Sequence, residues 1–349
     1  MKLINNLNEG PLDIVGDIHG ELPALESLLG HLGYGRSGAM RGGRKLVFVG
    51  DLVDRGPDSI AVFERVRKLV EAGIAQCVLG NHELNILLGE EKLDNGWFFS
   101  TDSAAALTDD QRGRILTFFS SLPLALERDD IRVVHACWNH TAIEAVRAGQ
   151  QQTDSISELH HHYIDDIRAL LKTGDHAQQY VIEEQQYGRY VKYDRSDPHE
   201  IWPDPVMLDA HAYEDEVWQM RHPIRVITSG EERKAVKVFP AGGKFRFLDR
   251  VPWWNNYVDS AAVVIGHYWR RYHPKKENIL GKFGPDLLGG IQPQHWMGAK
   301  NNVYCVDFSV GARASARADG KTEQHHKLAA LRWPEKEVVF DDGERRETV

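Results

Sequence analysis

The sequence is poor in cysteine, lacks long apolar runs and carries no excess of positive charge. Its three cysteines, Cys77, Cys137 and Cys305, are scattered and match neither a disulfide framework nor a thiolate metal site. No run approaches the roughly 20 apolar residues that cross a membrane, and the first residues contain no apolar stretch of signal-peptide length. The net charge of -9 disfavours a protein that coats nucleic acid. We therefore expect a cytoplasmic protein with reduced thiols, no membrane association and no nucleic-acid-binding tract.

Apolar residues are nonetheless abundant enough for a packed core, at 42% of the 349 residues. Five short apolar runs, rich in Val, Ile and Leu, each lead into a residue with an oxygen or imidazole ligand atom. In open α/β sheets, ligands collect outside the carboxyl ends of such buried strands, so we expect five strands that deliver one site. The runs are 12–15, 46–49, 74–79, 131–134 and 261–265.

The central motif is the stretch Gly50-Asp51-Leu52-Val53-Asp54-Arg55-Gly56. A strand ending at Val49 would place Asp51 at the edge of a sheet, with Asp54 three residues further on. The guanidinium of Arg55 could take a phosphoryl oxygen through two hydrogen bonds. Taken alone, the same stretch could be a turn with a structural Asp-Arg pair. The neighbouring motifs favour a functional site.

Helical spacing of apolar residues after three of these runs predicts helices over about 21–32, 57–73 and 82–89. Three consecutive strand-helix units imply a largely parallel sheet and hence an α/β fold. A capping box of Thr108 with Gln111 predicts the start of a further helix. The C-terminal part contains runs with the character of antiparallel strands that complete a second sheet. These runs are 303–308, 328–333 and 338–340.

The chain between His135 and His267 is far longer than one connection needs. A capping box of Ser155 with Glu158 predicts a helix within this region. We interpret about 150–225 as an insertion in a single domain that covers the whole chain. Our hypothesis is that the insertion acts as a lid or substrate selector. The alternative is that it lies far from the reacting groups and has no role in the reaction.

Six residues supply ligand atoms that are all oxygen or nitrogen, which suits divalent Mn, Fe, Zn or Co. One tetrahedral ion does not need six ligands. Two ions about 3.5 to 4 Å apart that share one carboxylate would use them all, and such a pair can clamp a phosphoryl group and generate a hydroxide near neutral pH. Asp51, central in the order of the motifs, is the expected bridge. The six are Asp17, His19, Asp51, Asn81, His135 and His267.

His82 directly follows Asn81, so the two side chains should diverge. If Asn81 points at a metal, His82 points across the site and is placed to be the general acid. Asp54 could hold its ring and raise its pKa. A histidine at the end of a strand is often only a satisfied core residue, but several candidates here follow strand-like runs, which favours the catalytic interpretation.

The motifs resemble those of the calcineurin-like metallophosphoesterase superfamily, within the branch of phosphoprotein phosphatases and symmetrical diadenosine tetraphosphatases. The resemblance rests on the stretches 16–20, 50–56 and 80–83, completed by His135 and by Gly266-His267. It implies a four-layer α-β-β-α sandwich with a di-metal site at the carboxyl edge of the strands. Relatives commonly use manganese, or iron with zinc.

The resemblance also implies roles for the individual residues. His82 with Asp54 would protonate the leaving oxygen, and Arg55 would bind phosphate. One metal would be held by Asp17, His19 and Asp51, and the other by Asp51, Asn81, His135 and His267.

Two departures from the family pattern bear on the substrate. Ala136-Cys137-Trp138 follows His135, and the last motif continues as Tyr268-Trp269-Arg270-Arg271. A second phosphate-binding arginine is expected from the family, but its motif is not recognisable here. We take Arg270 and Arg271 as substrate-binding candidates, with Arg246 and Arg250 as further possibilities.

The leading hypothesis is a metal-dependent phosphatase that hydrolyses phosphomonoesters, such as phosphoserine, phosphothreonine or phosphotyrosine in proteins. The alternative is a dinucleoside polyphosphate hydrolase, in which Trp253, Trp254, Trp269 and Arg270 would hold a nucleotide. Trp253, Trp254 and Tyr257 could instead belong to the core. A third hypothesis, a non-catalytic module that binds phosphate or a partner, has no chemical need for all six ligands.

Overall fold

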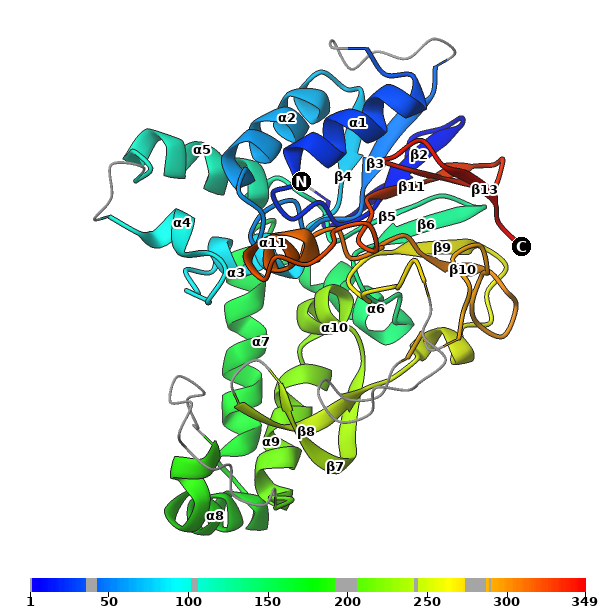
Figure 1. Cartoon of the computed structure of the whole chain (residues 1–349). Coiled ribbons are helices and arrows are strands. Elements are labelled where there is room, and N and C mark those ends of the chain that lie inside the picture. Colours follow the sequence, from blue (N-terminus) through cyan, green and yellow to red (C-terminus); the bar gives the residue numbers. More distant parts are fainter. Residues whose placement is uncertain are drawn as a thin grey trace.

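The computed structural model describes residues 2–35, 43–101, 106–191, 206–241, 244–273, 287–288 and 290–349 (Figure 1). In this part of the chain two β-sheets lie face to face, and helices cover their outer faces. The predicted α/β sandwich is therefore confirmed. None of the helices in the described residues is long and apolar enough to cross a membrane.

The larger sheet has six strands and contains the three predicted strand-helix units. Its strands β2, β3 and β4 pair in parallel. The connecting helices α1 (Leu22–Leu32) and α2 (Ser59–Glu71) follow the predicted ranges, and α3 (Asn81–Leu87) follows β4. In order across the sheet, the strands are β13 (Arg345–Glu347), β12 (Glu337–Phe340), β11 (Ala329–Trp333), β2 (Leu12–Val15), β3 (Lys45–Phe48) and β4 (Ala75–Cys77).

The second sheet has five strands, and its last strand corrects one prediction. We expected the run 303–308 to be antiparallel, but β10 pairs in parallel with β9. The other two C-terminal runs are antiparallel, as β11 and β12, and they extend the six-stranded sheet instead. In order, the strands are β1 (Ile4–Asn6), β5 (Ala125–Glu127), β6 (Ile131–Val134), β9 (Ala262–Ile265) and β10 (Val303–Cys305).

Alternate residues of each strand face opposite sides of its sheet, as the two-residue period of a strand requires. Ile14 of β2 and Val264 of β9 lie in the core between the two sheets. Val15 and Ile265, the next residues of the same strands, belong to the outer core beneath the helices. Burial on both faces explains why these strands are mostly apolar, with Asp13 of β2 as a buried exception that pairs with Arg44 and Arg332.

The helices outside the sandwich core are mostly short. The predicted capping box of α5 is present, since the Thr108 hydroxyl accepts from Gln111 N and the Gln111 side chain accepts from Thr108 N. The remaining helices of the sandwich are α4 (Gly96–Phe99), α5 (Asp109–Ser120), α6 (His140–Gly149) and α11 (Ala312–Ala318).

The expected insertion corresponds to an extension that projects from the sandwich (Figure 1). Ser155 caps α7 as predicted, whereas α8 was not expected, because its sequence is polar. Residues 192–205 of the insertion lie outside the described part. The elements of the extension and its connection are α7 (Ile156–Leu171), α8 (Asp175–Val191), α9 (Asp209–Met220), α10 (Pro223–Ser229), β7 (Glu232–Ala241) and β8 (Lys244–Arg250).

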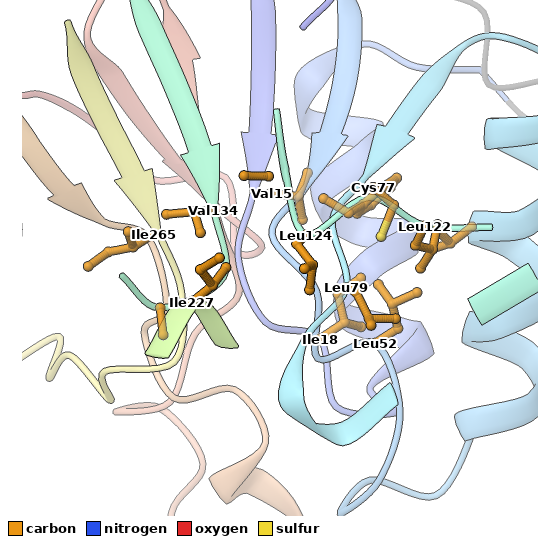
Figure 2. Close-up of a cluster of buried hydrophobic side chains, with 14 of the residues drawn as sticks. Val15, Ile18, Leu52, Cys77, Leu79, Leu122, Leu124, Val134, Ile227 and Ile265 are labelled. Carbon is orange, nitrogen blue, oxygen red and sulfur yellow. The ribbon is translucent and has the colours of Figure 1, made fainter. Parts of the chain in front are cut away.

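The carboxyl ends of strands from both sheets lie next to one cluster of buried apolar side chains. Figure 2 shows Val15, Val134 and Ile265, the last residues of β2, β6 and β9, with Leu52 and Leu79 nearby. The residues that follow these strands therefore emerge at one edge of the sandwich.

Two buried histidines pack together where α7 meets α10. The rings of His160 and His222 are 4.3 Å apart, and His222 is fully buried. Burial, followed by the charge of Arg225, lowers the pKa of His160 to about 4. Burial, followed by the charge of His160, lowers the pKa of His222 to about 3. Both rings are therefore neutral in the folded protein near pH 7.

This pair predicts a loss of stability in mild acid. A histidine with an unfolded pKa of about 6.5 that stays neutral in the fold lowers the free energy of unfolding as pH falls below that value. His222→Asn keeps a capping side chain for α10. In this variant the decrease in the free energy of unfolding between about pH 7 and pH 5 should be about 2 kcal/mol smaller than in the wild type. Urea unfolding at a series of pH values measures this slope.

The matched control is His162→Asn, because the His162 side chain is on the same helix α7 but is exposed. It should leave the pH dependence of unfolding as in the wild type. Equal slopes for wild type and His222→Asn would show that the buried pair is not responsible.

Candidate metal centre

Asp51 lies at the centre of the edge where the two sheets meet. Its side chain is buried, and its two oxygens face different histidines. Oδ2 is 3.6 Å from Nε2 of His19, and Oδ1 is 3.4 Å from Nε2 of His135. A carboxylate with one oxygen toward each half of a site has the geometry needed to bridge two ions.

On one side of Asp51, the ring orientation of His19 is fixed by the backbone. Nδ1 of His19 donates to the carbonyl oxygen of Val53 at 3.0 Å, which leaves the lone pair of Nε2 facing Asp51. Asp17 is also buried, and its Oδ2 accepts from the backbone N of His267 at 3.0 Å. This hydrogen bond holds the Asp17 carboxylate next to the last histidine motif.

On the other side, three potential ligand atoms converge. Oδ1 of Asn81 is 3.1 Å from Nε2 of His135 and 2.9 Å from Nδ1 of His267. Nδ1 of His135 donates to the carbonyl oxygen of Val49 at 2.8 Å, so its Nε2 is free to face the site. The structure therefore brings together all six residues that the sequence singled out, from both sheets.

The electrostatics of the centre suit cations. Burial lowers the pKa of His135, but the charge and hydrogen bond of Asp51 and the charge of Asp17 raise it to about 10. Oδ1 of Asp17 is buried and has no hydrogen-bond partner among the described residues. Buried carboxylates and unpartnered ligand atoms fit divalent metal ions, whose charge would compensate the anions. The residues therefore fit the metals that the family implies.

The backbone is held in an unusual conformation at this edge. In the described residues, positive φ values occur at eight non-glycine positions, and five of those belong to the site motifs. Such conformations cost about 1 to 3 kcal/mol each and persist only where the surroundings impose them. The five are His19 (φ 47°), Asp51 (φ 50°), Asp54 (φ 73°), Arg55 (φ 67°) and His267 (φ 63°).

Two motif glycines leave room for the carboxylates. A Cβ atom on Gly80 would lie 2.3 Å from Oδ1 of Asp51, and one on Gly266 would lie 2.0 Å from Oδ1 of Asp17. No side chain fits at those distances. The glycines before Asn81 and His267 are therefore required by close packing against the candidate ligands.

Glu83 holds the central turn and was not identified as a site residue from the sequence. Its buried Oε2 accepts from the backbone N of Asp51 at 2.9 Å and of Gly80 at 3.1 Å. Its Oε1 accepts from the backbone N of Leu52 at 2.7 Å and of Val53 at 3.3 Å. One carboxylate thus fixes the Asp51 turn against the start of α3.

His82 points away from the convergence of Asn81, as expected. Its Nδ1 is 2.6 Å from Oδ2 of Asp54, and Oδ1 of Asp54 accepts from the indole N–H of Trp97 at 2.6 Å. Burial lowers the pKa of His82, but the charge of Asp51 and the hydrogen bond to Asp54 raise it above its ordinary value. Trp97 lies in the short helix α4, where no sequence motif marked it.

Arg55 lies over both imidazoles on the open side of the site. Its Nη1 is 2.9 Å from Nε2 of His19, and its Nη2 is 3.2 Å from Nε2 of His82. The guanidinium also lies 4.7 Å from the centre of the Trp269 ring, and Trp269 is 54% exposed. A large exposed aromatic ring therefore stands beside the candidate phosphate-binding arginine.

The prediction for Arg270 was wrong. Its side chain is fully buried, and its guanidinium donates to the backbone oxygens of Cys305 (3.0 Å), Gln292 (2.6 Å) and His295 (2.6 Å). The Arg270 side chain therefore connects backbone segments in the core through hydrogen bonds and cannot reach a substrate. Arg271, the other candidate, is exposed.

The weaker arginine candidates lie on β8. Arg250 is exposed, and its guanidinium is 5.6 Å from the ring of Tyr268, which contacts His267. Burial lowers the pKa of His267, and the charge of Arg250 lowers it further. Arg246 lies four residues earlier on the same strand.

The core alternative for the tryptophan cluster is confirmed. Trp253, Trp254 and Tyr257 are all buried, and their rings contact one another edge to face. They do not form a nucleotide-binding wall.

The family model of the calcineurin-like phosphoesterases matches residues 10–267 of the chain. An asymmetrical bis(5'-nucleosyl)-tetraphosphatase of Oceanobacillus iheyensis is 49% identical over 74 residues, which are 20% of this chain and 30% of that protein. A symmetrical bis(5'-nucleosyl)-tetraphosphatase of Janthinobacterium sp. is 37% identical over 122 residues, which are 35% of this chain and 42% of that protein. The matches thus span less than half the length of these two curated relatives.

The structure of this chain also has limited similarity to solved phosphatase structures. A cold-active protein-tyrosine phosphatase of a Shewanella species has a TM-score of 0.47 at 15% identity, over 99% of this chain and 82% of that chain. A protein serine/threonine phosphatase of Saccharomyces cerevisiae has a TM-score of 0.46 at 13% identity, over 100% of this chain and 84% of that chain. Both scores are below 0.5, so these likenesses say nothing about the substrate.

The contacts of Glu83 predict a large effect of its removal. Glu83→Ala leaves four buried backbone N–H groups without their acceptor, and we expect the free energy of unfolding to fall by at least about 3 kcal/mol. Manganese binding, measured by calorimetry on chelator-stripped protein, should weaken because the Asp51 turn is no longer fixed. Glu71→Ala is the control, since Glu71 is exposed and forms a surface ion pair with Arg67 in the described part of the chain, and it should cost no more than about 0.5 kcal/mol.

Proposed function

The chain belongs to the calcineurin-like phosphoesterase family, and on that premise we propose that it hydrolyses phosphomonoesters at a centre of two divalent metal ions. The observation that carries this proposal is the pairing of His82 with Asp54 at 2.6 Å, directly beside six converging ligand residues. A metal centre needs a proton donor on the leaving-group side to cleave an ester efficiently.

The metals would be held by this chain's oxygen and nitrogen atoms. Such a ligand set suits manganese, and iron or zinc are compatible with it. When bound, the two ions supply a hydroxide nucleophile near neutral pH and stabilise the charge on the phosphoryl group. We assign one ion to Asp17, His19 and Asp51, and the other to Asp51, Asn81, His135 and His267.

Arg55 is the proposed phosphate ligand. A guanidinium that donates to Nε2 of His19 cannot share that lone pair with a metal, so metal binding by His19 would require the guanidinium to turn away from that ring and toward the phosphate. Two of its N–H groups can then take phosphoryl oxygens. The same movement uncovers Nε2 of His82.

His82 completes the reaction as general acid. Water releases one proton to solvent, and its oxygen forms a bond to phosphorus while the bond from phosphorus to the leaving oxygen breaks. Nε2 of His82 gives its proton to that leaving oxygen. Asp54, held by Trp97, stabilises the charged imidazole before the transfer. After release of the alcohol, a proton from solvent restores His82.

A second candidate substrate is a dinucleoside polyphosphate. The curated relatives described above are named as dinucleoside tetraphosphatases, and Trp269 offers a stacking surface next to Arg55. A base could stack on this ring while its phosphates reach the centre. The same ring would equally favour the aromatic group of phosphotyrosine, so Trp269 supports a flat substrate in either case. In both cases Arg250 is the proposed second arginine near the phosphates.

Metal dependence and the role of His82 can be tested together. Chelator-stripped protein should be inactive on p-nitrophenyl phosphate and regain activity with added manganese. His82→Ala should lower kcat for an alkyl phosphate about 10² to 10⁴-fold without lowering manganese binding. His140→Ala, at an exposed histidine, should leave kcat unchanged. Absence of metal-dependent turnover in the wild type would favour a binding module instead.

The substrate class is decided by comparing phosphopeptides with diadenosine tetraphosphate. We expect Trp269→Ala to raise KM at least about fivefold for phosphotyrosine peptides or the dinucleotide, because a stacked ring contributes about 1 to 3 kcal/mol. KM for phosphoserine peptides should not change. A higher kcat/KM of the wild type for the dinucleotide than for every monoester would replace the leading proposal by the second.

A further inference from the structure

A further buried carboxylate lies at the same edge and is not among the six ligands that the resemblance implies. Asp307 follows β10 and is only 1% exposed. Its Oδ1 accepts from the backbone N of Ser309 at 2.7 Å. Its Oδ2 is buried without a hydrogen-bond partner among the described residues. One of the two oxygens of this carboxylate therefore lacks a hydrogen-bond partner in the described residues.

The segment that carries Asp307 packs against Gly16 and against the ring of His19, two residues that flank Asp17 in the sequence. A Cβ atom on Gly16 would lie 2.4 Å from the backbone oxygen of Val306 and 3.4 Å from the backbone N of Asp307. A Cβ atom on Gly311 would lie 2.7 Å from the ring of His19. The stretch 306–311 thus touches the chain on both sides of Asp17.

Asp17 shares the unusual state of Asp307. Its Oδ1 is also buried without a partner in the described part of the chain. Asp17 directly follows Gly16, the residue that packs against the backbone of Val306 and Asp307. Two neighbouring carboxylates, each with an open oxygen, are costly to bury unless a cation lies near them.

A buried aspartate elsewhere shows how this fold satisfies a structural carboxylate. Asp13 is fully buried, and its oxygens accept from Tyr34 (2.9 Å), Arg44 (3.2 Å) and Arg332 (3.1 Å). Asp307 has no comparable set of partners. Its open oxygen therefore indicates a role other than bracing the fold.

We propose that Asp307 is a positioning residue for the metal site assigned to Asp17 and His19, and that its Oδ2 acts on this site through a bound water molecule rather than as a direct ligand. The inference rests on the proposed di-metal centre. Residues that orient a metal site from behind the ligands typically change metal affinity 10 to 100-fold when they are replaced.

Asp307→Asn tests the inference, because asparagine keeps the volume and the Oδ1 acceptor for Ser309 but removes the charge. Manganese titration of chelator-stripped protein by calorimetry should show one of two sites weakened 10 to 100-fold. The melting temperature of the stripped variant should equal or exceed that of the wild type, since a buried anion has been removed. The rise in melting temperature on adding manganese should shrink.

The matched control is Asp13→Asn, which should lower the melting temperature equally with and without manganese and leave both affinities unchanged. Asp341→Asn, at a buried aspartate paired with Arg313, serves the same purpose should Asp13→Asn not fold. Asp307→Ser is the second test variant, and it should weaken the same site.

The outcomes separate the two proposals. A wild type that binds no manganese overturns the di-metal centre. The role of Asp307 alone is overturned if the wild type binds two ions and the Asp307 variants bind them with affinities within twofold of the wild type. It is also overturned if the melting temperatures of these variants fall equally with and without metal.

Discussion

Burial of the Asp51 carboxylate where two sheets meet is the constraint on which the rest of this edge depends. An anion removed from water must be surrounded by donors or cations. Asp51 has histidines facing each of its oxygens, the backbone N–H of His82 at 3.1 Å and a turn fixed by Glu83. The left-handed backbone of Asp51 and the absence of a side chain at Gly80 follow from the same close packing.

The sandwich provides this arrangement because parallel strands from both sheets end at one edge. Each sheet contributes some of the six candidate ligands, so neither sheet brings them together alone. The sequence allowed most of this to be predicted, since buried parallel strands are continuous apolar runs and their ends carried polar ligand types. Strand direction was less predictable: β10 is short and its composition does not distinguish a parallel from an antiparallel neighbour.

The errors and omissions at the site share a physical cause. Arg270 is close to His267 in sequence, but its partners Gln292 and His295 are backbone oxygens that no side-chain pattern reveals. Glu83 and Trp97 act through a backbone turn and a neighbouring carboxylate, respectively. Asp307 does follow an apolar run, as the other site residues do, and that signal could have identified it.

The hydrogen bond from the backbone of His267 to Asp17 spans 250 positions of the chain. Contacts of such long sequence separation form late, because the intervening chain must be ordered first. A chain still being synthesised can therefore build its first strand-helix units while the complete ligand set is absent. The proposed metal centre would therefore be complete only after the second sheet closes and His267 reaches Asp17.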